Sequence, residues 1–516
     1  MQIRSEHVLV RAKYVLPFSE GQRGRVIKDG YVLTDGPIIK EMGAYSPDVG
    51  LRLQKEHGDS LKVVGDVSNA NQITMLDAAV MPSPKYGHTH FHESALIGRF
   101  RDLQLLRWLD KAVNPHTRWM YDMHQGIATG QWTNSAYKEI ARQLGKSPYE
   151  IVFAKTLYDI LRNGGDFIAV HHCNFTKYDD PVDAVIRILE RAKARAIVFP
   201  GAQDQYYAPP FLLDTNPQKA AERVNAQMQR HWGNKYARVM PGADQIFSNT
   251  GPLLAALKGV ARNMENETGQ PVFFHIHSSE NAGAVRMVIE TTGLTPIGRA
   301  ERAGILDNRT IVAHQVHTTE GDLNLLQSRR VNVISNPTAN GSLFSGIAPV
   351  ADFIRRGIRV AYSTDGSGSS DHQDIFAVMA TGVNMNRGRD GDGADNITCQ
   401  KALEMILVEP ALIYGLNADS LKPGKDASFI VFDLDPNRNS FMVPNSADNI
   451  MDLLVFGNAS GRNILHSLSR GEWMVSDGRV VTMDAEMILR EIQLLSDIYW
   501  GEVYPKLNID LGTGGG

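Results

Sequence analysis

The feature that most constrains the fold is an alternation of short apolar runs with longer segments of helical period between about residues 85 and 400. The apolar runs are four to eight residues long and rich in Val, Ile and Phe. Such alternation is typical of strand–helix units that build a parallel sheet. The central part of the chain is therefore predicted to be an α/β domain.

Eight of these apolar runs are candidate strands. One precedes Gly87, and the others cover residues 166–170, 196–199, 237–240, 272–277, 310–313, 331–335 and 358–363. Eight strands spread over roughly 300 residues fit a (β/α)8 barrel of the TIM type with insertions. The sequence predicts this barrel over residues 83–415.

Both ends of the chain have a different pattern, in which short β-rich runs are separated by turn residues. These runs cover residues 7–16, 31–42, 73–81, 427–432, 452–456 and 473–481. Residues 1–82 and 416–484 are therefore predicted to form one small β-sandwich domain from both ends of the chain. Residues 485–516 are predicted to form a C-terminal helix to about Trp500 and a flexible tail.

Composition excludes several classes of partner. With 43% hydrophobic and 21% charged residues and a net charge of −4, the chain is globular and has no basic surface for nucleic acid. No segment reaches the roughly 18 apolar residues that span a membrane, and the N-terminus lacks a secretory signal pattern. Two cysteines, Cys173 and Cys399, do not make a disulfide framework. We expect a cytoplasmic protein that binds a small-molecule substrate, with no nucleic-acid or membrane partner.

Histidines gather where the predicted strands end. His88 and His90 are two residues apart at the end of the first strand, so their side chains point to the same face. His277 closes the 272–277 run, and His314 follows the 310–313 run directly. Taken singly, each of these residues is better explained as a buried polar group. Together they converge on one mouth of a barrel, where imidazoles can bind a metal ion.

Two acidic residues extend this pattern. Glu280 stands three residues after His277, where a carboxylate can reach over a bound metal and move a proton. Asp365 follows the last predicted strand in an Asp-Gly pair, which alone is also the composition of an ordinary turn.

The order of these motifs, HxH, HxxE, H and DG, resembles that of the amidohydrolase superfamily. The similarity is greatest to the mononuclear deaminase and chlorohydrolase branch, which includes cytosine, guanine and S-adenosylhomocysteine deaminases and the triazine hydrolases. Residues 102–109, 335–350 and 421–433 are also similar to segments of that branch. The resemblance covers nearly the whole chain.

The resemblance implies one divalent metal ion and a ligand set. The implied ligands are His88, His90, His277, His314 and Asp365. His314 is either a direct ligand or a neighbour of the metal, because members of the branch differ at this position. A single ion is expected because residues 240–242, at the end of the fourth strand, contain no Lys or Glu to bridge two metals. Zinc is the expected metal and ferrous iron the alternative, since nitrogen and oxygen ligands suit both.

The implied reaction is hydrolytic. A divalent ion lowers the pKa of bound water from about 16 to about 7, which makes hydroxide available to attack an sp2 carbon. Asp365 is implied as the acceptor of the water proton, Glu280 as the donor to the ring or amide nitrogen, and His314 as the group that polarises the attacked group or the water. Deamination of a nitrogen heterocycle is therefore the predicted function. Hydrolysis of an acyclic amide, urea or carbamate, or dechlorination of a heteroaromatic compound, is the alternative, and a binding protein without catalysis is a third reading.

Residues just beyond the ligands are expected to contact substrate. The expected substrate residues are His92, Trp108, His172 and Asn336. Two stretches depart from the pattern of the branch. Residues 119–148 are longer than usual and are predicted to cover the mouth of the barrel, and Asp371 and His372 replace an asparagine-containing run. The resemblance also implies a homo-oligomer, because relatives commonly associate through their barrel helices, and the sequence does not fix the number of subunits.

Overall fold

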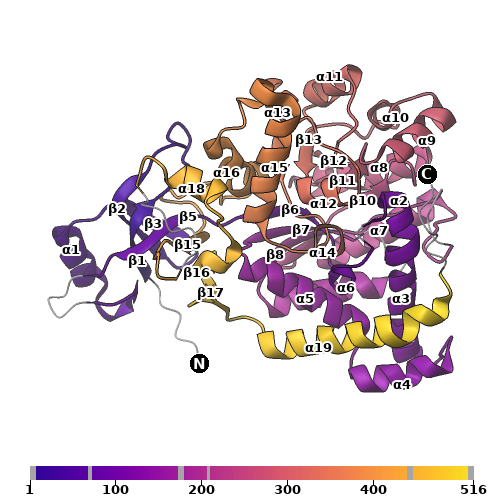
Figure 1. The fold of residues 1–516 in the computed structure, drawn as a ribbon, viewed down its shortest axis with the longest axis horizontal. Coiled ribbons are helices and arrows are strands. Elements are labelled where there is room, and N and C mark those ends of the chain that lie inside the picture. The colour runs from indigo at the N-terminus through magenta and orange to yellow at the C-terminus, as the bar shows by residue number, and fades with distance from the viewer. Residues whose placement is uncertain are drawn as a thin grey trace.

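The structure is a computed structural model that describes residues 7–67, 73–100, 102–172, 179–205, 210–438 and 446–509. Figure 1 shows a β-rich region on the left and a larger α/β region on the right, whose helices lie around a set of central strands. The first and last parts of the chain meet in the β-rich region. The described residues thus have the mixed α/β character that the sequence predicts.

Two parallel sheets form the centre of the α/β region. The first has the order β6 (Lys85–Thr89), β7 (Phe167–His171), β8 (Arg195–Phe199) and β9 (Ala237–Val239). The second has the order β10 (Gly242–Gln245), β11 (Phe274–Ser278), β12 (Thr310–His314), β13 (Asn332–Ser335) and β14 (Val360–Tyr362). Every residue of β6, β7 and β11 to β14 is buried, as expected for parallel strands covered on both faces. The eight predicted strands are all present.

The two parallel sheets adjoin at both of their edges. Met240 donates from its backbone to Val198 of β8 at 2.9 Å, and only Pro241 then separates it from β10 in the second sheet. At the other edge, the His88 backbone N–H donates to Ser363 Oγ at 3.1 Å, and this hydroxyl donates to the carbonyl of His88 at 2.6 Å. β6 therefore lies beside the end of β14.

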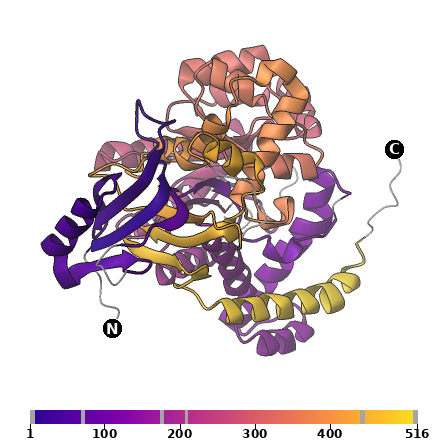
Figure 2. The ribbon, with the colours of Figure 1, turned by 60° about the vertical axis from the view of Figure 1, so that its left-hand side comes forward.

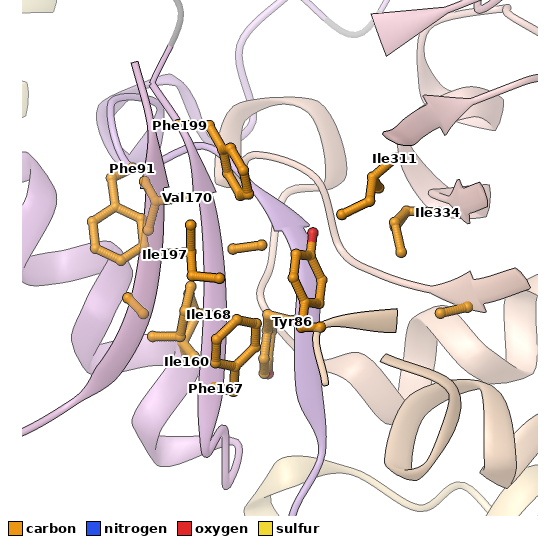
Figure 3. Close-up of a cluster of buried hydrophobic side chains, with 14 of the residues drawn as sticks. Tyr86, Phe91, Ile160, Phe167, Ile168, Val170, Ile197, Phe199, Ile311 and Ile334 are labelled. Carbon is orange, nitrogen blue, oxygen red and sulfur yellow. The ribbon is translucent and has the colours of Figure 1, made fainter. Parts of the chain in front are cut away.

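Apolar side chains fill the space between the two sheets. Figure 3 shows Ile197 and Phe199 of the first sheet and, on the other side of the view, Ile311 and Ile334 of the second. Gly87 leaves room for this packing, because a Cβ atom there would lie 2.8 Å from Cδ1 of Ile334. The interior is a packed core, so that chemistry is confined to the ends of the strands.

Helices connect these strands and cover their outer faces. They are η2 (Ser94–Leu96), α2 (Leu105–Trp108), η3 (Leu109–Val113), α3 (Asn114–Thr129), α4 (Ser135–Leu144), α5 (Pro148–Arg162), α6 (Asp179–Arg191), α7 (Pro217–His231), α8 (Gly251–Thr268), α9 (Ala282–Thr292), α10 (Pro296–Arg302), α11 (Glu320–Arg329), α12 (Pro337–Ser342), α13 (Val350–Arg355), α14 (Ser367–Ser370), α15 (Ile375–Asp390), η5 (Gly391–Ala394), α16 (Cys399–Leu407) and α17 (Glu409–Ile413). The boundaries follow local chemistry. α8, for example, begins where the Thr250 side chain accepts from the Leu253 backbone and ends at Gly269, whose φ of +66° suits glycine.

A nine-stranded sheet combines both ends of the chain. Its strands are β1 (His7–Val15), β2 (Ile27–Asp35), β3 (Ile38–Ala44), β4 (Leu61–Val64), β5 (Leu76–Pro82), β15 (Phe429–Asp433), β16 (Ile464–Ser469), β17 (Glu472–Ser476) and β18 (Arg479–Val480). β5 and β15 join the two ends as antiparallel neighbours, with Met81 opposite Ile430. α1 (Pro47–His57) and η1 (Gly58–Ser60) connect β3 to β4. The two ends of the chain thus share one sheet, whereas a separate small β-sandwich domain stays a prediction.

One predicted strand is wrong. Residues 452–456 lie in a helix, α18 (Ile450–Phe456), which packs against α15 and α16. Its buried side chains, Ile450, Leu454 and Val455, have helical spacing and share one face. In a seven-residue element this spacing is difficult to distinguish from a short apolar strand, which explains the error.

The C-terminal segment runs along the outside of the α/β region. α19 (Ala485–Ile498) continues through η7 (Tyr499–Val503) and η8 (Tyr504–Leu507), as the sequence predicts for a terminal helix. α19 packs against α4 and α5, and Figure 2 shows it beside α4 at the lower edge of the molecule. Cys399 is a free thiol, whereas Cys173 and the predicted tail at 510–516 lie outside the described residues. None of the helices in the described ranges has both the length and the apolar character needed to cross a bilayer.

Candidate metal centre

Four strand ends bring the predicted metal-binding side chains together. His88 lies in β6, and His90 follows that strand directly. His277 lies in β11 and His314 is the last residue of β12, while Asp365 stands just beyond β14. Because these strands are parallel, their C-terminal ends share one side of the molecule. All five side chains are buried, and none is more than 6% exposed.

The five side chains surround a single point. The candidate ligand atoms of His88, His277, His314 and Asp365 lie within 4.8 Å of one another. His90 Nε2 lies 3.1 Å from His277 Nε2 and 3.3 Å from Asp365 Oδ1, and His88 Nε2 lies 3.1 Å from the same oxygen. Four imidazoles and one carboxylate thus form a compact set of nitrogen and oxygen donors, which suits a divalent metal.

The hydrogen bonds of His90 and His277 determine which of their ring nitrogens face the centre of the cluster. His90 Nδ1 lies 2.8 Å from the carbonyl of His171, and His277 Nδ1 lies 2.6 Å from the carbonyl of Asp244. A carbonyl oxygen only accepts, so both Nδ1 atoms carry the proton and both Nε2 atoms present lone pairs in the neutral rings. These two lone pairs face each other across 3.1 Å. A positive charge resolves that repulsion, either a proton on His90 or a shared metal ion, so the residues present fit a metal ion.

The pKa values of the cluster indicate the same need. Burial lowers the pKa of His88 to about 3 and that of His277 well below its ordinary value. Burial also acts to lower the pKa of His90, but the hydrogen bond and charge of Asp365 outweigh it and raise that pKa to about 9. Burial acts to raise the pKa of Asp365, whereas the histidines around it bring that pKa well below its usual range. The side chains alone therefore favour one positive charge beside the carboxylate.

His314 is oriented by an asparagine. Its Nδ1 donates to Asn340 Oδ1 at 2.8 Å, which turns Nε2 toward the site. Asn336 Nδ2 lies 3.4 Å from the same Nδ1, at the edge of hydrogen-bond distance. Asn336 and Asn340 are both fully buried. His314 is thus held from behind in the tautomer that a metal ligand needs.

Glu280 lies over the cluster on the side of His314. Its Oε2 accepts from Gln245 Nε2 at 3.0 Å and lies 3.7 Å from His314 Nε2. The side chain is buried, and this burial raises the pKa of Glu280 above its ordinary value. A carboxyl group in this environment is suited to hold and deliver a proton.

Backbone strain marks three of the strand ends. Ser279, His314 and Asp365 have φ values of +50°, +71° and +61°, although none of them is glycine. The left-handed region is unfavourable for such residues and is maintained only where the surrounding contacts impose it. The chain therefore turns sharply where β11, β12 and β14 end, which directs the following side chains into the site.

A pocket of about 620 Å³, including solvent at its mouth, opens above the cluster. The lining residues are His90, His92, Glu93, Leu105, Trp108, Leu109, Asn114, Gln203, Asp244, Gln245, Phe247, Ser248, His277, Glu280, His314, Leu343 and Asp365. Its walls combine apolar side chains with a few convergent polar groups, as a heterocyclic substrate requires.

The predicted substrate residues divide into two groups. His92 and Trp108 line this pocket, whereas His172 and Asn336 are fully buried and are not among its described lining residues. None of residues 119–148, which were predicted to cover the mouth of the barrel, is among the described residues that line the pocket. Trp119 is instead buried in the core. The wall comes instead from α2, η3 and the start of α3.

Several residues of the site have no clear signal in the sequence. Gln245 holds Glu280 and Asn340 holds His314, but both contacts join residues that are distant in the chain. His275, one pleat deeper than His277, packs against the ring of His88 with centroids 4.9 Å apart. Asp371 and His372 are not part of the described lining. The alternation of the strands predicts a residue one pleat deeper than His277, but not the amide partners.

Comparison with known proteins gives one family and similar relatives. The amidohydrolase family matches residues 87–474. A 5-methylthioadenosine/S-adenosylhomocysteine deaminase of Nitratidesulfovibrio vulgaris (strain DP4) is 27% identical over 441 residues, covering 84% of this chain and 87% of the relative. A 5'-deoxyadenosine deaminase of Methanocaldococcus jannaschii is 24% identical over 463 residues, covering 86% of this chain and 95% of the relative.

A solved structure has the same fold. The atrazine chlorohydrolase of Arthrobacter aurescens TC1, crystallised as a complex with zinc, superposes with a TM-score of 0.77 at 18% identity. The match covers 95% of this chain and 100% of that one. The fold therefore extends over both the α/β region and the nine-stranded sheet.

Proposed function

Because the chain belongs to the amidohydrolase family, we propose that it is a metal-dependent hydrolase that removes an amino group from a nitrogen heterocycle. One observation carries this proposal. His88, His277, His314 and Asp365 have ligand atoms within 4.8 Å of one another beside a pocket, and His90 Nε2 lies 3.1 Å from His277 Nε2. Glu280 lies next to this group, 3.7 Å from His314 Nε2. A protein that only bound its ligand would have no need for a buried carboxyl group placed over a metal site.

The proposal includes the organisation of the chain. We infer that the two parallel sheets are halves of one eight-stranded barrel over residues 83–415, with β9 and β10 as one interrupted strand. Residues 1–82 and 416–484 are proposed as the small β domain, and residues 485–516 as a C-terminal extension. The adjoining edges of the sheets and the pairing of β5 with β15 support this division. Homo-oligomer formation and a cytoplasmic location stay predictions.

The proposed metal ligands are His88, His90, His277, His314 and Asp365. When bound, a divalent ion supplies Lewis acidity, which makes water a nucleophile near neutral pH. Zinc is the proposed ion because the donors are nitrogen and oxygen atoms, and ferrous iron remains the alternative. The lone pairs that His90 and His277 direct at each other support a cation at this point.

The side chains around the ligands divide the proton transfers between them. Asp365 is the proposed acceptor of a proton from the attacking water. Glu280, fixed by Gln245, donates a proton to the ring nitrogen. The proton that Asp365 takes from the water then passes to the departing amine, and the hydroxyl proton of the intermediate returns to Glu280 as the carbonyl forms. His314, held by Asn340, stabilises the charge that develops on the attacked group. His92 and Trp108 are proposed to contact the substrate in the pocket, and His172 and Asn336 to act from behind its wall.

The substrate class is proposed from the pocket and the relatives together. Trp108 and Phe247 offer apolar surfaces to a flat ring, and Gln203, Asp244 and Ser248 offer polar groups around it. The two relatives are named as deaminases of adenine-containing compounds. Adenine nucleosides and their thioether derivatives are therefore the first compounds to test.

The experiment combines metal analysis with a screen for released ammonia. We expect about one zinc or iron per purified chain and ammonia release from an aminated purine, pyrimidine, pterin or triazine. Release of chloride, an alkylamine or a carboxylic acid without ammonia would replace deamination with the alternative hydrolysis. Absence of metal after reconstitution with zinc and with ferrous iron would refute the proposal.

A further inference from the structure

Two sequence features near the site have no part in the proposed reaction. Glu93 stands three residues after His90, and a run of glycine and serine follows Asp365. The Glu93 side chain is buried, with only 3% of the residue exposed. A buried carboxylate needs hydrogen-bond partners, so the residues around Glu93 indicate why it is present.

The partners of Glu93 lie in the run after Asp365. Glu93 Oε2 accepts from the backbone N–H groups of Gly368 at 3.1 Å and Ser369 at 3.2 Å. Ser369 Oγ lies 2.9 Å from Asp365 Oδ2 and 3.4 Å from Glu93 Oε2. The hydroxyl has one proton and three nearby acceptors, because the Gly366 carbonyl also lies 3.0 Å from Ser369 Oγ. The charged Asp365 carboxylate is the nearest of the three and the stronger acceptor, which favours that hydrogen bond. Glu93 thus fixes the backbone of the residue that holds the second oxygen of Asp365.

The space around Glu93 is fitted to this contact. A Cβ atom at Gly366 would lie 1.8 Å from Glu93 Oε2. A Cβ atom at Gly368 would lie 2.9 Å from the Cβ of Leu96 and 3.1 Å from the Cβ of Glu93. Both glycines are therefore needed for the carboxylate to reach the backbone of this run. The unusual run after Asp365 and the carboxylate after the HxH motif form one structural unit.

Asp365 needs such support because of its own conformation. Its φ of +61° is unfavourable for a residue with a side chain. Its two oxygens also have different surroundings, since Oδ1 faces His88 Nε2 at 3.1 Å while Oδ2 accepts from Ser369. A rotation of the carboxylate would exchange these roles. The hydrogen bond from Ser369 opposes that rotation.

We propose that Glu93 is a positioning residue that acts on Asp365 through Ser369. It anchors the backbone of Gly368 and Ser369, so that the Ser369 hydroxyl holds Oδ2 and leaves Oδ1 directed at the metal position. This inference rests on the proposed function, because it assumes that Asp365 is a metal ligand. It predicts that Glu93 and Ser369 contribute to metal affinity as one unit.

The test measures zinc affinity by competition with a chromophoric chelator in Glu93→Ala, Ser369→Ala and the double variant. Each single change is expected to weaken zinc binding by roughly tenfold, in the range typical of residues that orient a metal ligand. The double variant is expected to lose little more than either single variant, because both break the same link. Ser94→Ala is the matched control, since Ser94 Oγ donates to the Val152 carbonyl at 2.9 Å and is buried next to Glu93.

Glu93→Gln separates positioning from a loss of folding. The amide keeps an oxygen that accepts from Gly368 and Ser369, so this variant is expected to keep zinc affinity closer to the wild type than Glu93→Ala does. In turnover assays, kcat is expected to fall in Glu93→Ala and Ser369→Ala, with KM nearly unchanged. Zinc affinities equal to that of Ser94→Ala, or fully additive losses, would overturn the inference. A wild-type chain that binds no zinc would instead count against the proposed function.

Discussion

At the residue scale, the site depends on acceptors that stand behind its histidines. The backbone carbonyls of His171 and Asp244 hold His90 and His277. These two contacts do not depend on the side chains of His171 and Asp244. His314 differs because its acceptor is the side chain of Asn340. Substitution of Asn340 therefore tests the importance of a fixed tautomer, since it leaves the histidine itself unchanged.

Asn340→Ala is expected to lower zinc affinity or kcat by roughly 10- to 100-fold, because the His314 ring loses the acceptor that fixes its tautomer and orientation. Chelator competition and steady-state kinetics measure the two effects. Asn332→Ala is the control, because Asn332 is also buried and donates only to carbonyls at the opposite end of β13. Equal effects of the two substitutions would show that only folding is affected.

Glu280→Gln is expected to lower kcat by about 10²- to 10⁴-fold, the usual contribution of a positioned general acid. The amide cannot deliver a proton, but its oxygen still accepts from Gln245, so metal content is expected to stay at the wild-type level. Ammonia release and metal analysis on the same preparation provide the measurement. Glu404→Gln serves as the control, because Glu404 is equally buried and pairs with Arg23 away from the pocket. Full turnover in the Glu280 variant would remove Glu280 from the reaction.

The sequence predicts the histidine and carboxylate cluster because each member sits at a fixed offset from the end of a strand. His88, His90, His277, His314 and Asp365 are brought together by the parallel sheets alone, and the fold required no further information. Gln245 and Asn340 differ, because their roles depend on contacts with side chains 35 and 26 residues away. Such distant pairs of amides have no periodicity in the sequence, so they become visible only in three dimensions.

At the element scale, the wall of the pocket depends on the C-terminal segment. Trp500, in η7, donates from Nε1 to the Ala95 carbonyl at 2.8 Å, and the Arg99 guanidinium lies 4.6 Å from its ring. Trp500 also packs against the apolar cluster that contains Leu105 and Trp108, two lining residues of the pocket. The C-terminal segment thus braces α2 from outside.

Trp500→Ala is expected to raise KM several-fold with little change in metal content, because α2 loses its outer support while the ligands keep theirs. Steady-state kinetics on the substrate from the ammonia screen, together with metal analysis, test this expectation. Trp473→Ala is the matched control, since Trp473 lies in β17 and its ring contacts Lys62 at 4.0 Å. An unchanged KM in Trp500→Ala would mean that α2 is rigid without the C-terminal segment.

Elements were predictable where their pattern was long or repeated. The parallel strands and α19 appear at the expected positions because buried strands and a long amphipathic helix leave strong signals. α18 was mistaken for a strand because only seven residues carry its pattern. β16 (Ile464–Ser469) was missed because the polar residues His466, Ser467 and Ser469 interrupt its apolar ones.

At the scale of the whole molecule, a buried ionic cluster joins the parallel sheets to the nine-stranded sheet. Asp166, just before β7, pairs with Arg195 at the start of β8 and accepts from Ser428 Oγ at 3.0 Å and Ser469 Oγ at 2.5 Å. Arg195 also donates to Asp426 at 2.6 Å. The serines and Asp426 belong to the C-terminal half of the nine-stranded sheet and its approach, so this cluster lies where the two regions meet.

This junction was beyond prediction from the sequence. Asp166 and Ser469 are 303 residues apart, and nothing near either residue indicates its partner. The same is true of the register between β5 and β15, which fixes how the two ends of the chain combine. Pattern predicts which segments are strands, whereas their partners are selected by burial of complementary faces and charges across the whole fold.

Asp166→Asn is expected to destabilise the whole molecule by about 3 kcal/mol at neutral pH, because it removes one partner from a buried ion pair. Burial raises the pKa of Asp166, but Arg195, Lys85 and Ser469 outweigh this and lower it overall below the ordinary value. A carboxyl group with a depressed pKa in the folded state stabilises the fold above its unfolded pKa of about 4, and this contribution is lost as the pH falls through the folded value. The thermal-unfolding temperatures of wild type and Asp166→Asn should therefore differ by several degrees at pH 7 and converge in acid below the folded pKa.

Asp352→Asn, which breaks an exposed ion pair with Arg355, should have almost no effect at either pH. A gap between wild type and Asp166→Asn that persisted unchanged in acid would show that the ionised carboxylate is not what joins the two regions.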